Sequence, residues 1–164
     1  MIDTTTVTAV DETVLRRAIE VAQRSRDAGN HPFGAVLVTA DGESFEAQNT
    51  VGSGDPTGHA ETNLVRLASR HLSRDQFRAS TLYTSTEPCA MCAGAIYWAG
   101  IGRVVYALPE QELAALVPAQ DGEPTMDLPC REVFARGGQT IVVAGPALIQ
   151  EAAAVHAGFW DARP

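Results

Sequence analysis

The sequence predicts a three-layer α/β/α sandwich in which helices cover both faces of a mixed five-stranded sheet. The main observation is that segments with strand character alternate with segments of helical periodicity after an initial hairpin, a pattern typical of α/β domains. Size and composition agree, because 164 residues of which 45% are hydrophobic are enough for one ordinary core. The chain has no internal repeat and no linker, so we expect one domain over residues 1–164.

The N-terminal part is expected to form an amphipathic helix followed by a hairpin. Residues 11–28 place apolar side chains at three-to-four spacing, which predicts a helix with one buried stripe. Asp11 is the predicted N-cap, and Gly29 is expected to end the helix. The next stretch, FGAVLVTADGESFEAQN at 33–49, predicts two strands joined by an Asp-Gly turn at 41–42.

A loop rich in Gly, Asp and Pro, VGSGDPTG at 51–58, leads into alternating helices and strands. Helical spacing resumes at His59, and a helix at 89–100 is opened by Pro88 and closed by Gly100. The other predicted elements are, in order, a strand at 80–85, a strand at 102–108, a short helix at 109–117, a strand at 139–145 and a helix at 147–157. Residues 118–129 contain three prolines and are expected to be irregular.

Charge and hydropathy exclude several classes of protein. The chain has 12 basic side chains, all of them Arg, against 20 acidic ones, for a net charge of −8. A protein that grips a phosphate backbone usually has a basic surface, so we expect no nucleic-acid partner. No apolar run approaches the roughly 20 residues of a membrane-spanning helix, and MIDTTTVTAV lacks the basic start of a signal peptide. A cytoplasmic protein without membrane contact is the expectation.

Two of the three cysteines lie close together in PCAMC at 88–92. An odd count is a poor disulfide framework. Cys89 and Cys92 are three apart in the first turn of a predicted helix, so they share one face, and the positive helix end favours thiolates. They can be a redox pair, part of a closed structural zinc site with Cys130, or two ligands of a catalytic metal.

His59 is the best candidate for a third ligand. It also opens a helix after a loop, and two helix starts at one edge of a sheet can meet at one point. One His and two Cys around zinc leave a fourth position for water, which distinguishes a catalytic zinc from a closed structural one. Glu61 lies two residues after His59, so its carboxylate can sit beside the metal and carry a proton from water to a substrate.

The combination of HAE at 59–61 with PCAMC at 88–92 is the zinc-deaminase signature H-x-E followed by P-C-x-x-C. The chain therefore resembles the cytidine and deoxycytidylate deaminase superfamily over roughly residues 11–108. Within it, the likeness is greatest to bacterial guanine deaminases and related free-base deaminases. HPFGAV at 31–36, NTVGSGDPTGHAE at 49–61 and GAIYWA at 94–99 carry this finer resemblance.

The resemblance implies a cytidine deaminase-like fold, one Zn²⁺ and hydrolytic deamination of a free nucleobase or related amino-heterocycle. Guanine, which would give xanthine and ammonia, is the first expected substrate. The implied site is as follows: zinc on His59, Cys89 and Cys92; catalysis by Glu61; and substrate binding by Phe33, Asn49, Ala60 and Trp98. A homodimer is also implied.

Several alternatives stay open at this point. A tRNA adenosine deaminase of the same superfamily is disfavoured by the net charge of −8 and by GAIYWA. A cytosine or triazine deaminase fits the same motifs, and a structural zinc-binding module without catalysis is the alternative from another class. Residues 109–138 match no pattern of the family. HAGFW at 156–160 resembles family tails that reach the active site of a neighbouring subunit.

Overall fold

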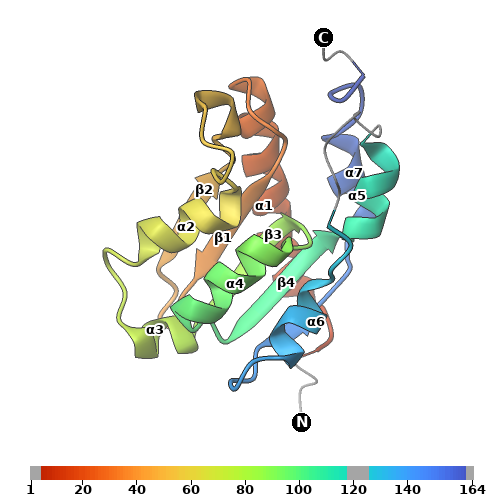
Figure 1. Cartoon of the computed structure of the whole chain (residues 1–164). Coiled ribbons are helices and arrows are strands. Elements are labelled where there is room, and N and C mark those ends of the chain that lie inside the picture. The colour runs from red at the N-terminus through yellow and green to blue at the C-terminus, as the bar shows by residue number, and fades with distance from the viewer. Residues whose placement is uncertain (1–4, 118–125, 162–164) are drawn as a thin grey trace.

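The structure is a computed structural model that describes residues 5–117 and 126–161, and it has a mixed five-stranded sheet between two layers of helices (Figure 1). The strands are β1 (Gly34–Val38), β2 (Ser44–Gln48), β3 (Thr81–Thr86), β4 (Arg103–Leu108) and β5 (Val142–Ala144). Their order in the sheet is β2-β1-β3-β4-β5. β1 pairs antiparallel with β2 and β3, whereas β3, β4 and β5 run parallel. The predicted α/β/α fold with a mixed five-stranded sheet is confirmed.

The helices divide into two layers because each strand turns alternate side chains to opposite faces of the sheet. The helices are α1 (Ala9–Asp27), α2 (Ala60–Ala68), α3 (Arg74–Arg78), α4 (Ala90–Ala99), α5 (Glu110–Leu116), α6 (Cys130–Ala135) and α7 (Ile149–Ala154), with a 3₁₀ turn at Val51–Ser53. One core lies between the sheet and α2, α3, α4 and α6, and includes Leu64, Ile96 and Phe134. The other lies between the sheet and α1 and α7.

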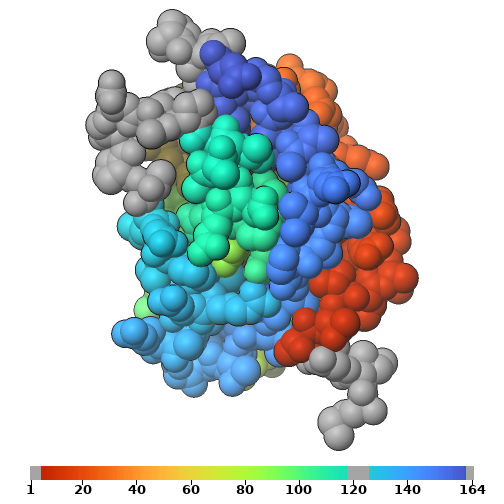
Figure 2. Space-filling view, turned by 90° about the vertical axis from the view of Figure 1, so that its right-hand side faces the viewer, coloured from red at the N-terminus to blue at the C-terminus, as the bar shows by residue number. Residues whose placement is uncertain are grey.

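Figure 2 shows α5 on the molecular surface, between the C-terminal segment and the residues that lead into α6. Leu113 of α5 packs at the edge of the core formed by α1 and α7. The predicted helix at 109–117 is confirmed, since α5 covers Glu110–Leu116. Most of the predicted proline-containing irregular segment, residues 118–125, lies outside the described residues.

The start of α1 differs from the prediction. Thr8 is the N-cap, and Asp11 is the third helical residue of a capping box in which each side chain bonds the other's backbone N–H. Asp11 is also buried, where it accepts hydrogen bonds from Tyr83 Oη at 2.9 Å and Arg103 Nη1 at 2.7 Å. This carboxylate therefore ties α1 to β3 and β4 as well as capping the helix.

Two short helices were not predicted. α3 is capped by Ser73, whose partner is Gln76, and this Ser-x-x-Gln pattern is a recognisable capping signal. α6 begins after Pro129 within the segment that matches no family pattern. The predicted C-terminal elements are shorter than expected, since β5 has three residues and α7 has six. No described helix has the length and apolar character to cross a membrane.

Gly34 allows α1 to lie directly on β1. A Cβ atom at this position would be 2.5 Å from the carbonyl oxygen of Ala18 and 2.7 Å from Cβ of Val21. Both distances are closer than real Cβ contacts. The backbone of β1 therefore passes against α1 directly after Phe33.

Candidate zinc centre and active site

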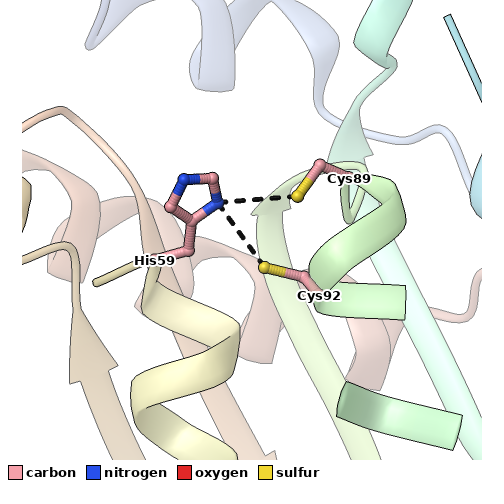
Figure 3. Close-up of side chains that lie close together, drawn as sticks. All are labelled: His59, Cys89 and Cys92. Atoms are coloured by element: carbon pink, nitrogen blue, oxygen red, sulfur yellow. Dashed lines mark hydrogen bonds between the residues drawn. The ribbon is translucent and has the colours of Figure 1, made fainter. Parts of the chain in front are cut away.

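The three predicted metal ligands come from the starts of two neighbouring helices (Figure 3). His59 is the N-cap of α2 and Cys89 is the N-cap of α4, and both have extended backbone conformations. Cys92 follows one turn later in α4 and is buried. Because α2 and α4 lie side by side on the same face of the sheet, the imidazole points at both sulfurs.

The geometry fits a tetrahedral zinc ion. His59 Nδ1 lies 3.5 Å from Cys89 Sγ and 3.6 Å from Cys92 Sγ, and the three ligand atoms lie within 4.8 Å of one another. Zinc bonds of about 2.3 Å to sulfur and about 2.0 Å to nitrogen at a tetrahedral angle require a nitrogen–sulfur separation of about 3.5 Å. Both nitrogen–sulfur distances therefore match the spacing that a tetrahedral zinc ion needs.

The charge state of the cysteines also suits a cation. A hydrogen bond from the Cys92 thiol lowers the pKa of Cys89 to about 4, although burial acts in the opposite direction. A hydrogen bond with His59 lowers it further. The hydrogen bond between the two cysteines, together with burial, raises the pKa of Cys92. One thiolate thus forms readily, and the second forms only when a positive charge compensates it. A zinc dication supplies that charge, and thiolates are its ligands.

Cys130 does not join the other two cysteines. It is the first residue of α6 and is buried in the core, and its backbone N–H donates to Glu87 Oε1 across 3.1 Å. Within residues 5–117 and 126–161, the group that could hold a metal contains only His59, Cys89 and Cys92. The interpretation as a closed zinc site with three cysteines and one histidine is not supported.

Glu61 lies beside the ligands in a buried position, with 6% of its surface exposed. The Thr84 hydroxyl donates to Glu61 Oε1 across 2.9 Å. Burial raises the pKa of Glu61, and the negative charge of Cys89 raises it further. A carboxyl with a raised pKa next to a metal site is suited to proton transfer near neutral pH.

A cavity of about 80 Å³ opens beside this centre, and its lining consists of Phe33, His59, Glu61, Thr86, Glu87, Cys89, Glu110 and Leu113. A larger groove of about 500 Å³ lies elsewhere, along α6 and β5. We place the site in the smaller cavity because the metal ligands and Glu61 line it. Its walls combine carboxyl groups with the apolar faces of Phe33 and Leu113.

The predicted substrate-binding residues differ in where they lie. Phe33 lines the cavity. Asn49 is buried next to it, since the Asn49 N–H donates to the Phe33 carbonyl oxygen across 3.1 Å. Ala60 is buried as the first residue of α2, so its N–H has no partner within the helix.

Trp98 is not part of the cavity of its own chain, contrary to the prediction. Its surface is 81% exposed. It follows Cys89 by nine residues, or two and a half helical turns, so it projects from the opposite side of α4. The motif GAIYWA places Trp98 on the correct helix but on its outer face.

The sequence did not indicate Glu110 as a site residue. Glu110 is the first residue of α5, and its backbone N–H donates to Glu87 Oε2 across 3.1 Å. Burial, followed by the charges of Cys89 and Glu87, raises the pKa of Glu110 to about 7. The hydrogen bond that positions Glu110 at the site joins it to Glu87, which is 23 residues earlier in the chain. No local sequence pattern indicates a contact over this separation.

The aromatic tail, residues 156–160, packs against other residues of the same chain. The ring of His156 meets Phe33 at 5.3 Å between centroids, and Trp160 meets His31 at 5.2 Å. Trp160 Nε1 donates to His156 Nδ1 across 3.2 Å. Burial, with Arg26 nearby, lowers the pKa of His156 to about 4. Residues 156–160 therefore form an aromatic wall behind Phe33.

Comparison with known proteins identifies the family of this site. Residues 8–108 match the cytidine and deoxycytidylate deaminase zinc-binding region. The chain belongs to the cytidine and deoxycytidylate deaminase family. As a member of this family, the protein is a zinc-dependent deaminase, and His59, Cys89 and Cys92 form its zinc-binding site. The catalytic-metal interpretation of the cysteine pair is thereby confirmed.

Relatives within the deaminase family include enzymes that act on different bases. A probable cytosine deaminase of Schizosaccharomyces pombe is 42% identical over 152 residues, covering 92% of this chain and 93% of that protein. Guanine deaminase of Bacillus subtilis is 46% identical over 105 residues, covering 63% of this chain and 67% of that protein. The structure of NE0047 in complex with 2,6-diaminopurine has a TM-score of 0.76 at 27% identity, covering 96% of this chain and 85% of that one.

Proposed function

We propose that this deaminase acts on a free nucleobase, and that its substrate is a one-ring amino-pyrimidine with cytosine as the first candidate. The observation that carries this choice is the extent of the likeness to the S. pombe protein, which spans 92% of the chain. That span must include most of the residues after β4. Those residues supply Glu110, Leu113 and the aromatic wall behind Phe33, so they shape the cavity.

Cavity size supports a single ring. A cavity of about 150 Å³ takes up benzene, whereas the cavity beside Glu61 measures about 80 Å³. Even one ring therefore requires the lining to move apart slightly, and two fused rings require a larger opening. Cytosine, which would give uracil and ammonia, fits with the smaller rearrangement.

Guanine is the second candidate. The 46% identity with the B. subtilis guanine deaminase and the two-ring base bound to NE0047 favour it. The two candidates share the reaction: the oxygen of water bonds to the amine-bearing ring carbon, the carbon–nitrogen bond breaks, and ammonia leaves. They differ in the space and the hydrogen bonds that the cavity must provide.

Zinc bound at His59, Cys89 and Cys92 would supply a water molecule activated for attack. Glu61 is the proposed proton carrier. Its carboxyl takes a proton from the attacking water, gives it to a ring nitrogen, and later transfers the second water proton to the leaving amine. A single buried carboxyl suffices for these steps because it gives away each proton before it takes up the next.

The base is held by residues that lie in or next to the cavity. Phe33 packs against the ring. The Asn49 side-chain oxygen accepts the Val51 N–H across 2.9 Å, so the amide NH₂ is the group that can donate to the base. The free N–H of Ala60 provides a second donor. These groups suit a neutral heterocycle with a carbonyl oxygen.

Ammonia release over a panel of substrates tests this proposal. Zinc-loaded protein is incubated with cytosine, guanine, adenine, an amino-triazine, cytidine and a tRNA anticodon stem-loop at low and high salt. We expect cytosine to react fastest and with little salt dependence, because a neutral base releases no counterions. Faster turnover of guanine would favour the second candidate. Salt-sensitive deamination of the RNA alone would overturn the proposal.

A further inference from the structure

Three buried side-chain atoms of the described residues have no hydrogen-bond partner: Thr86 Oγ1, Glu110 Oε2 and His156 Nε2. Thr86 and Glu110 line the candidate cavity, and the ring of His156 meets the lining residue Phe33 edge to face. Buried polar atoms in folded proteins are almost always paired, so each exception calls for an explanation. Because two of the three belong to residues that line one cavity, the cavity is a place for a polar ligand.

Glu110 and its neighbour Glu87 have different roles. The two oxygens of Glu87 accept the backbone N–H groups of Glu110 and Cys130, each across 3.1 Å. Glu87 is therefore occupied in joining the starts of α5 and α6. Glu110, held in place by that bond, lines the cavity, and its own Oε2 atom is buried without a hydrogen-bond partner.

We propose that Glu110 is a substrate-binding residue, whose Oε2 atom accepts a hydrogen bond from an N–H group of the base. The inference deepens the proposed function and rests on it. Free amino-heterocycles carry N–H donors on ring nitrogens and on the amine, and the carboxylate form of Glu110, which such a donor would stabilise, only accepts. Hydrogen bonds to a charged group are shorter and stronger than those between neutral groups. Glu110 would therefore favour bases that present an N–H to it.

The position of Glu110 is unfavourable for its ionised carboxylate, so this residue lowers the stability of the folded protein. Burial and the charges of Cys89, Glu87, Asp127 and Glu61 all disfavour its ionised form. Replacing an unpaired buried polar group with an apolar group of similar shape is often neutral or stabilising. Substitution of a binding residue of this kind should weaken binding while stability stays constant or rises. A purely structural residue would lose both together.

Glu110→Met and Glu112→Met provide a matched pair. Glu112 lies in the same first turn of α5 but is exposed, so its substitution controls for changes in the helix. Zinc content, thermal unfolding midpoint, kcat and KM for cytosine and guanine, and the shift in midpoint caused by each base are measured. We expect Glu110→Met to keep zinc, to unfold at the same or a higher temperature, and to raise KM roughly 10- to 100-fold. Glu112→Met should match the parent protein.

An unchanged KM in Glu110→Met, on a base that the parent deaminates, would overturn the assignment and leave the proposed function intact. A lower unfolding midpoint with joint loss of zinc would assign Glu110 a structural role and would also overturn it. If no base reacts with the parent or stabilises it, the proposed function fails first, and the role of Glu110 fails with it.

Discussion

The Thr84 hydroxyl lies 2.9 Å from Glu61 Oε1 and 2.9 Å from the carbonyl oxygen of Thr86. A hydroxyl has one proton, so it can fully serve only one of these acceptors while Glu61 is ionised. When Glu61 gains a proton it becomes a donor, and both bonds can then form. The arrangement suits a carboxyl that takes up and returns a proton in each cycle.

Substitution of Thr84 tests this relationship. We expect Thr84→Val to keep zinc and fold but to lower kcat about 10-fold, because the buried carboxyl loses a hydrogen-bond partner worth roughly 1 kcal/mol or somewhat more. Thr81→Val, at the opposite end of β3, is the control. Steady-state kinetics and zinc content are the measurements. Equal kcat in the two variants would show that Thr84 does not assist Glu61.

Zinc stoichiometry tests the ligand set. We expect one zinc per chain in the parent protein and a large loss in Cys89→Ser, since the remaining donors are too few for tight binding. Cys130→Ala is the matched control, because Cys130 is buried but lies outside the ligand group. Elemental analysis of purified protein gives the result. Full zinc in Cys89→Ser, or its loss in Cys130→Ala, would contradict the assignment.

Local patterns in the sequence predicted the parts of the site that depend on short spacings. Pro88 and Gly100 bound α4 as expected, and Gly100 ends it with a φ of 83°. The spacing of Cys89 and Cys92, and the position of His59 at a helix start, were enough to predict the zinc ligands. These features depend on neighbouring residues and on helix ends, both of which are visible in sequence.

Other features depend on contacts between distant segments. Glu110 reaches the cavity through its bond to Glu87, and the aromatic tail reaches Phe33 from the far end of the chain. The position of Trp98 could not be predicted for a different reason. Whether a residue lines a cavity depends on which side of its helix it occupies. α4 is apolar around much of its circumference, so hydrophobic periodicity did not distinguish its inner face from its outer one.

Asp11 is expected to be a major source of stability. Burial alone would raise its pKa, but hydrogen bonds from Arg103, Thr8 and Tyr83 hold the pKa of this carboxyl well below its usual range. Asp11→Asn removes the negative charge that pairs with Arg103, so we expect a loss of about 3 kcal/mol in the free energy of unfolding at pH 7. Urea unfolding of the two proteins measures the difference.

The same measurement at lower pH gives the sign of the effect. Because the pKa of Asp11 is lower in the folded chain, the unfolded chain binds a proton first as the pH falls. The stabilisation is complete above about pH 4 and decreases as the pH falls further. The difference between parent and Asp11→Asn should shrink by about 1 kcal/mol between pH 6 and pH 3. A constant difference would mean that the Asp11 carboxylate is not the titrating group.

The outer face of α4 is a candidate dimer interface. Met91 and Trp98 are seven residues apart on one side of the helix, and both are exposed. We expect a homodimer in solution and expect Trp98→Glu to weaken it at least 30-fold, since buried interface tryptophans typically contribute 2 kcal/mol or more. Val10→Glu on α1 controls for charge. Light scattering that gives the single-chain mass of 17.4 kDa for the parent would contradict this.

The catalytic role of Glu61 is tested by ammonia release from cytosine and guanine with zinc-loaded parent protein and with Glu61→Gln. The amide is nearly the same size as the carboxyl but cannot carry protons, so zinc content and unfolding midpoint should not change. Positioned acid–base groups typically contribute about 100- to 10,000-fold to turnover. We expect measurable deamination of at least one base by the parent and a loss of that size in Glu61→Gln. Near-parental turnover in Glu61→Gln, or no deamination of either base by fully zinc-loaded parent protein, would contradict this expectation.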